Sequence, residues 1–149
     1  MRLGFVAGAF CLFVSGVVVV GLGVQKPVVE VFKSSTCGCC NKWVKHLEDN
    51  GFLVEAANVT DLAQVKERAG VPGSLASCHT AIIDGYVVEG HVPVNDLKRL
   101  LEERPDVLGI SVPGMPIGSP GMEGPNPQSY DVVAFTEDGS LSRFSSHRP

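Results

Sequence analysis

Three cysteines fall within four positions of the stretch SSTCGCCNKW, at Cys37, Cys39 and Cys40. Cys37 and Cys40 have the C-x-x-C spacing of a dithiol redox pair, which forms and breaks a disulfide by thiol exchange. Cys39 is a third thiol that such a pair does not need, because it invites shuffling to the wrong disulfide. Clustered thiolates are typical ligands of soft metal ions, among them Cu(I), zinc and iron–sulfur centres. These residues therefore leave two chemistries open, electron exchange and metal binding.

Further candidate metal ligands lie outside the stretch 34–43. Cys78 and His79 are adjacent, and His79 could be either a ligand or a structural hydrogen-bonding residue. Met115 and Met122 occur in the similar contexts PGMP and PGME. On a Pro/Gly-rich segment their thioethers could bind Cu(I), or the side chains could only pack the segment onto the domain. His91, in the stretch EGHVP, is expected to be structural.

Zinc is a second metal that these donors could bind. Cys37, Cys39 or Cys40, Cys78 and His79 could supply the four ligands of a tetrahedral site. The spacing does not match the usual zinc pattern of two C-x-x-C pairs, so zinc is the less favoured metal.

The strands and helices around the cysteines determine where these candidate ligands lie. The β-branched run at 27–35 predicts a strand, and apolar residues at helical spacing predict a helix at 40–51. Cys37 is therefore expected at or just before a helix N-terminus, where free N–H groups favour a thiolate. A strand at 52–59 and a helix at 61–70 continue the alternation.

The second half predicts a different order of elements. Two β-branched runs flank an Asp-Gly dipeptide and predict a hairpin at 80–91, followed by a helix at 93–105. The Pro/Gly-rich segment 113–127 predicts a long loop, and a second hairpin is expected at 130–144. The whole order predicts an α/β fold, with a mixed sheet flanked by helices and a C-terminal loop plus hairpin.

A C-x-x-C pair at a strand-to-helix junction is the thioredoxin-like arrangement. In that fold the loop before the third strand faces the C-x-x-C pair, and here this loop carries Cys78 and His79. The usual cis-proline of that loop is not evident, because no proline follows Thr80. We therefore predict a thioredoxin-like domain in which the fourth thiol lies beside the first three.

The start of the chain has a different composition. Arg2 is the only charge before Lys26, and an apolar run occupies residues 3–24. A short positive start followed by an apolar run is typical of an export signal, and this run is also long enough to span a bilayer. We expect residues 1–24 to be a cleaved signal peptide or a retained membrane anchor, and residues 27–145 to form one exported domain.

Charge and cysteine usage argue against two other kinds of protein, a nucleic-acid-binding protein and a module held together by structural disulfides. The chain has 12 Lys+Arg and 16 Asp+Glu, and no basic patch interleaved with aromatic residues, which argues against nucleic-acid binding. An exported compartment permits disulfides, so two structural disulfides are an alternative. The clustering of three thiols with one distant thiol suits such cross-linking poorly.

Three blocks of the sequence resemble one known family. VFKSSTCGCCNKWVKHLEDNGF, GVPGSLASCHTAIIDGYVVEGHVP and VPGMPIGSPGME together are similar to the CopG-like family of small exported proteins associated with bacterial copper resistance. The similarity covers residues 27–145. It implies a thioredoxin-like fold and a C-x-C-C motif that, with a distant cysteine, binds copper. The implied ligands are Cys37, Cys39, Cys40 and Cys78.

The resemblance also implies a function. It implies a periplasmic protein that holds Cu(I) in a thiolate site, which could be multinuclear, and that could interconvert Cu(I) and Cu(II) and pass copper to envelope transporters or chaperones. Besides the implied ligands, His79 is a candidate auxiliary ligand, and we expect the loop bearing Met115 and Met122 either to cover the site or to hand copper on. The alternative is a thiol–disulfide oxidoreductase that uses only Cys37 and Cys40, so whether the chain is an enzyme stays open.

Overall fold

The computed structural model of the chain describes residues 27–149. The predicted signal peptide or anchor at 1–24 lies outside these residues. Among the helices of 27–149, none combines the length and the apolar character that crossing a bilayer requires.

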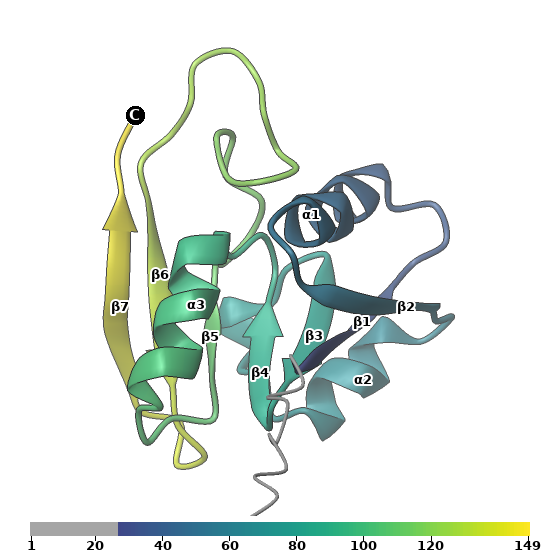
Figure 1. The fold of residues 1–149 in the computed structure, drawn as a ribbon. Coiled ribbons are helices and arrows are strands. Elements are labelled where there is room, and N and C mark those ends of the chain that lie inside the picture. The colour runs from purple at the N-terminus through teal and green to yellow at the C-terminus, as the bar shows by residue number, and fades with distance from the viewer. Residues whose placement is uncertain (1–26) are drawn as a thin grey trace, which may run out of the picture.

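The described part of the chain is built around one mixed sheet of seven strands (Figure 1). Its strand order is β2-β1-β3-β4-β5-β6-β7. β1 is parallel to β2 and β4 is parallel to β5, while the other neighbours are antiparallel. The mixed α/β class predicted from the sequence is confirmed. The strands are β1 (Val28–Lys33), β2 (Leu53–Asn58), β3 (His79–Ile83), β4 (Tyr86–Glu89), β5 (Gly109–Ser111), β6 (Tyr130–Phe135) and β7 (Leu141–His147).

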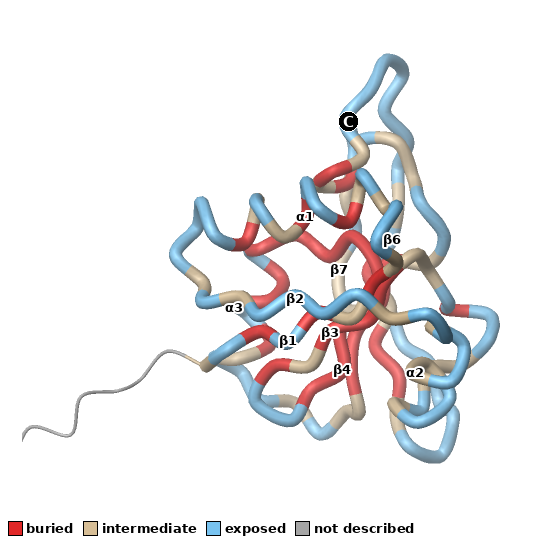
Figure 2. Tube along the Cα trace, turned by 90° about the vertical axis from the view of Figure 1, so that its right-hand side faces the viewer, coloured by how far each residue is buried: buried red, intermediate tan, exposed pale blue. Residues whose placement is uncertain are grey.

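Helices cover both faces of this sheet. Trp43 and Leu97, both fully buried, belong to the larger core cluster. Val87 and Val88 are neighbours in β4 but belong to the smaller and the larger cluster respectively, because successive side chains of a strand point to opposite faces. Figure 2 shows the buried strands enclosed between these layers. The helices are α1 (Gly38–Asp49), α2 (Leu62–Arg68) and α3 (Val94–Glu103), with a short 3₁₀ turn at Gly73–Leu75.

The predicted elements exist, with shifted bounds and one omission. The first strand ends at Lys33, and α1 begins at Gly38. No element was predicted between 105 and 113, where the structure has β5. This strand has only three residues, all buried, so it carries no alternating pattern. A Cβ at Gly109 would lie 2.1 Å from the carbonyl oxygen of Val87, so glycine permits the close approach of β5 to β4.

The strand pairing brings three distant segments to one end of the sheet. β3 is antiparallel to β1, with Lys33 opposite His79, and β4 is antiparallel to β3, with Thr80 opposite Glu89. The end of β1, the start of β3 and the end of β4 therefore meet at the same end of the sheet. The chain leaves β1 there to enter α1, which places the cysteine-rich stretch beside the segment before β3 (Figure 1).

Candidate metal centre

The first turn of α1 positions three cysteines. Cys37 is the N-cap residue, and its Sγ accepts a hydrogen bond of 3.3 Å from the backbone N–H of Cys40. Cys37 and Cys40 are joined by a disulfide, with their Cα atoms 5.3 Å apart. Cys39 carries a free thiol, whose Sγ lies 3.5 Å from that of Cys37. The predicted C-x-x-C pair is therefore oxidised in this structure, and a third thiol lies beside it.

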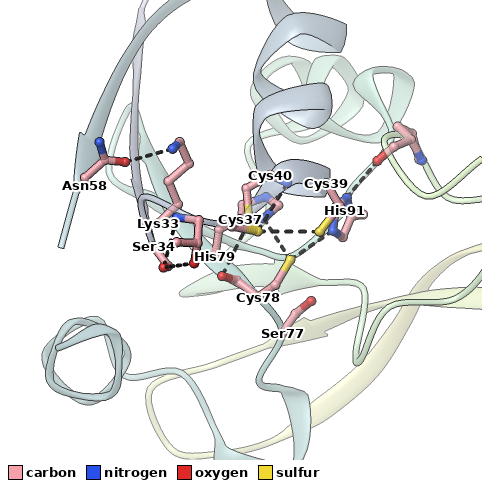
Figure 3. The surroundings of a disulfide bond; sticks show 12 residues. Lys33, Ser34, Cys37, Cys39, Cys40, Asn58, Ser77, Cys78, His79 and His91 are labelled. Atoms are coloured by element: carbon pink, nitrogen blue, oxygen red, sulfur yellow. Dashed lines mark hydrogen bonds between the residues drawn. A yellow bond between two sulfur atoms is a disulfide. The ribbon is translucent and has the colours of Figure 1, made fainter. Parts of the chain in front are cut away.

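Cys78 completes a cluster of four sulfur atoms (Figure 3). The Sγ atoms of Cys37, Cys39, Cys40 and Cys78 all lie within 4.8 Å of one another. Burial raises the pKa of the Cys78 thiol to about 12, and the nearby Cys39 adds to the rise. The sequence-based placement of the fourth thiol beside the other three is thus matched by the geometry. Reduction of the disulfide would make four thiol donors available at one point.

His91 contacts the cluster although the sequence suggested a structural role. Its Nε2 lies 2.9 Å from the Sγ of Cys78, and its Nδ1 lies 2.8 Å from the carbonyl oxygen of Pro120. A carbonyl oxygen only accepts, so Nδ1 must carry the proton and donate it to Pro120. Burial lowers the pKa of His91. In the neutral ring the Nε2 lone pair therefore faces Cys78, which is the orientation that a metal-binding histidine needs.

The sequence did contain a signal for this contact. A two-residue Asp-Gly turn fixes the register of the hairpin that it connects. With Ile83 opposite Tyr86, the ladder runs back to Thr80 opposite Glu89, and its continuation places Cys78 opposite His91.

His79 lies next to the cluster and is fully buried. Its Nδ1 is 3.3 Å from the Sγ of Cys78, and its ring packs on Trp43 with centroids 4.4 Å apart. Burial, with further contributions from His91 and nearby lysines, holds the pKa of His79 well below its usual range. Its Nε2 is buried without a hydrogen-bond partner. Cys78, His79 and His91 thus form a second group of donor atoms within 4.8 Å of one another.

A buried ion pair holds the segment that carries Cys78. The Glu89 carboxylate is fully buried and accepts hydrogen bonds from the Thr80 hydroxyl at 2.7 Å and from the Ser77 backbone N–H at 2.6 Å. Lys66 of α2 forms the ion pair, with its Nζ 2.5 Å from Glu89 Oε1. The hydrogen bond from its backbone N–H to Glu89 holds Ser77, the residue before Cys78, in place. Residues 27–149 contain no cis peptide bond, so this segment has no cis-proline.

The Pro/Gly-rich loop lies over the cluster. Besides the Pro120 contact to His91, the loop brings Gly121 so close to α1 that a Cβ there would lie 2.8 Å from the Cys39 carbonyl oxygen. At its other end, the Gly114 carbonyl oxygen accepts a hydrogen bond from the Ser77 hydroxyl. Each of these glycines touches a residue of the site or next to it. The predicted covering role of the loop is consistent with these contacts.

The two methionines directly follow those glycines. Met115, after Gly114, has an exposed fraction of 52%. Met122, after Gly121, is partly buried. Their roles as thioether ligands stay predictions.

Replacing Gly121 with alanine tests whether the loop must close on α1. Gly121 has φ +85°, and Gly139 has a matching φ of +83° in open space. Gly139→Ala should cost about 1 kcal/mol of stability from the left-handed backbone alone. Gly121→Ala should cost more, because the methyl group also collides with α1. Urea denaturation of both variants measures this. Equal costs for the two variants would show that the loop does not have to close on α1.

Comparisons with known proteins agree with this geometry. A family model described as a protein of unknown function, DUF411, matches residues 75–122, which include Cys78 and His91. Two solved structures named copper resistance protein copG, Form 1 and Form 2, are each 46% identical to this chain, with TM-scores of 0.79. They cover 84% and 83% of this chain, and the chain covers 100% of each. Comparison with curated proteins found no match. With this identity over nearly all of the described residues, the chain belongs to the CopG-like family of copper-resistance proteins.

Proposed function

We propose that this chain binds copper as Cu(I) in a thiolate site formed by Cys37, Cys39, Cys40 and Cys78. The observation that carries the proposal is the gathering of four sulfur atoms within 4.8 Å of one another. Soft thiolate ligands favour Cu(I), and sulfur atoms this close can bridge several ions. The 46% identity to structures named copper resistance protein copG supports copper rather than zinc as the metal.

The Cys37–Cys40 pair gives the site a source of electrons when it is reduced to two thiols. If reduced Cys37 and Cys40 meet two Cu(II) ions, the two thiols lose two electrons and two protons and form one disulfide, and two Cu(I) ions result. In this structure the pair is oxidised and two thiols are free, which is the arrangement that this reaction would leave. Interconversion of Cu(I) and Cu(II) in copper resistance is therefore part of the proposal. A separate reductant would have to return the disulfide to two thiols before each new round.

The remaining assignments are part of the same proposal. A thioredoxin-like class is supported by the C-x-x-C pair at the β1–α1 junction and by Cys78 facing it. We assign the protein to the periplasm, either released by cleavage of residues 1–24 or anchored by residues 3–24. Its proposed partners are the metal ion and envelope copper transporters or chaperones. Met115 and Met122, on the loop over the site, would accept or release Cu(I) as soft donors.

Anaerobic Cu(I) titration of the reduced protein tests the proposal. We expect more than one copper ion per chain, with the free thiols consumed together. Cys39→Ser should reduce the number of copper ions bound per chain, because serine removes a bridging thiolate and leaves the C-x-x-C pair intact. Unchanged copper capacity in Cys39→Ser would remove the main support for a thiolate cluster.

The observed disulfide also favours a second candidate function. A thiol–disulfide oxidoreductase would use only Cys37 and Cys40, which are the pair oxidised here. It predicts reduction of insulin by the reduced protein, with a rate indifferent to Cys39→Ser. No tight copper binding, together with reversible cycling of the Cys37–Cys40 disulfide, would favour this function over copper handling.

A further inference from the structure

We infer that Glu89 is a positioning residue for the thiolate site, and that its buried carboxylate, paired with Lys66, holds the Cys78 thiol beside the cysteines of α1. The inference rests on the proposed function, which gives Cys78 its role as a ligand. It goes beyond that function by assigning side chains outside the ligand set that fix where this thiol lies.

The Glu89 carboxylate binds the chain on both sides of Cys78 and His79. Its Oε1 accepts a hydrogen bond from the Ser77 backbone N–H at 2.6 Å, and its Oε2 accepts one from the Thr80 hydroxyl at 2.7 Å. These two bonded residues directly flank Cys78 and His79, so the segment is held before and after the thiol. Two hydrogen bonds to one planar group fix the direction of the segment as well as its position.

The backbone of this segment lacks the feature that usually fixes it. In the thioredoxin-like arrangement the loop before the third strand usually carries a cis-proline, and residues 27–149 contain no cis peptide bond. Proline has no N–H to donate, whereas Ser77 has one, and Glu89 accepts it. The contact with the Glu89 side chain therefore takes the place of a backbone constraint.

Lys66 of α2 makes the buried carboxylate tolerable. The Glu89 side chain is fully buried, and Lys66 Nζ lies 2.5 Å from its Oε1 and 3.0 Å from the Thr80 hydroxyl oxygen. A buried charge without an opposite charge is strongly destabilising, and a carboxylate accepts hydrogen bonds more strongly than a neutral oxygen does. The ion pair therefore provides a strong acceptor at a place that water does not reach.

Ser77 extends this network to the Pro/Gly-rich loop. Its hydroxyl donates a hydrogen bond to the Gly114 carbonyl oxygen. The backbone carbonyl oxygen of Glu89 accepts a hydrogen bond from the Val112 N–H at 3.0 Å. The residue that holds the segment of Cys78 therefore also holds the start of the loop that lies over the site.

The test compares two variants that differ in the acceptor alone. Both carry Lys66→Met, which removes the cation of the pair. Glu89→Gln then keeps an oxygen that accepts from the Ser77 N–H and an NH₂ group that donates to Thr80 Oγ1. Glu89→Leu has a similar volume and no acceptor, and apolar replacement of a buried ion pair is compatible with folding.

Phenylarsine oxide measures the position of the thiols without copper. It condenses with two neighbouring thiols and releases one water. Cys39 and Cys78 are the free thiols of residues 27–149, and their Sγ atoms lie within 4.8 Å of each other beside the Cys37–Cys40 disulfide. The glutamine variant should bind the arsenical as tightly as the wild type. The leucine variant should bind it about fivefold to tenfold more weakly, the effect of one lost hydrogen bond.

Two further measurements make the result specific to positioning. Leu100→Ala opens a cavity in the core beneath α3 and destabilises the fold, but it leaves the contacts of Glu89 in place, so its affinity for the arsenical should equal that of the wild type. Hydrogen exchange of the wild type, followed by NMR, needs no variant. The Ser77 N–H should exchange about tenfold or more slowly than the Ala76 N–H, whose acceptor, the Gly73 carbonyl oxygen, is 3.4 Å away.

Equal affinities of the glutamine and leucine variants for the arsenical would overturn the inference, as would an equal loss of affinity in Leu100→Ala. If the leucine variant does not fold, the exchange rate decides, and a Ser77 N–H that exchanges as fast as an exposed amide overturns the inference. If the two variants differ as expected while the reduced wild type binds no copper, Glu89 still positions the thiol and the proposed function fails.

Discussion

Replacing Cys78 with serine is expected to lower the affinity for Cu(I) by more than about 100-fold, since several thiolate bonds at one centre depend on it. Cys78 belongs to both donor groups, the four cysteines and the Cys78–His79–His91 set. Serine has nearly the same shape but offers a hard, neutral hydroxyl that Cu(I) binds poorly. Competition with bicinchoninate under anaerobic conditions measures the affinity of both proteins.

The same variant separates copper handling from disulfide exchange. Cys78→Ser leaves the Cys37–Cys40 pair and the N-cap contact of α1 in place. A thiol–disulfide oxidoreductase should therefore keep its rate of insulin reduction in this variant. A folded Cys78→Ser protein that binds copper as tightly as the wild type would contradict the site described here. Urea denaturation of the metal-free protein serves as the control for folding.

Replacing Lys66 with methionine is expected to destabilise the fold by about 3–5 kcal/mol. The Glu89 carboxylate is fully buried, and the Lys66 ammonium is the cation that pairs with it. Methionine removes that charge and leaves a buried carboxylate with only two neutral donors, Thr80 and the Ser77 N–H. Removing one partner of a buried pair is costly because the other charge stays desolvated. Urea denaturation of the metal-free protein gives the free energy of unfolding.

An exposed ion pair in the same protein provides the control. Lys45 and Asp49 on α1 form an ion pair of 2.7 Å, but their side chains are 72% and 58% exposed. Lys45→Met should cost less than about 0.5 kcal/mol, because water screens the pair. Lys66→Met/Glu89→Gln should recover part of the loss, since it removes the buried charge as well. Equal costs for Lys66→Met and Lys45→Met would refute the role given to the Lys66–Glu89 pair.

Much of the fold could be predicted because its signals are local. The helical spacing of apolar residues in α1 and the Asp-Gly turn between β3 and β4 depend on residues close in sequence. The N-cap position of Cys37 followed from the junction of strand and helix. β5 was missed because three buried residues carry no periodic pattern, and its place in the sheet depends on contacts distant in sequence.

Part of the set of candidate metal ligands could also be predicted, because its signals are local. The cysteine spacing at 37–40 is such a local pattern. Cys78 was added by analogy with the thioredoxin-like fold, in which the loop before the third strand faces the C-x-x-C pair. His91 was expected to be structural from its immediate neighbours alone, although the register of the Asp84-Gly85 hairpin places it opposite Cys78. Its contact with Cys78 arises from the register of an antiparallel pair, and its orientation arises from the carbonyl of Pro120, distant in sequence.

The amino-acid sequence was therefore sufficient for the chemistry, a soft thiolate site, and for the order of the elements that carry it, since both depend on residue type and near neighbours. Only the tertiary structure decided how the histidine rings meet the thiols and what holds the segment before Cys78. The Pro120 carbonyl oxygen turns the Nε2 of His91 toward Cys78, and the buried Glu89 binds the Ser77 N–H and Lys66. These contacts join segments that are distant in sequence, which short-range patterns do not encode.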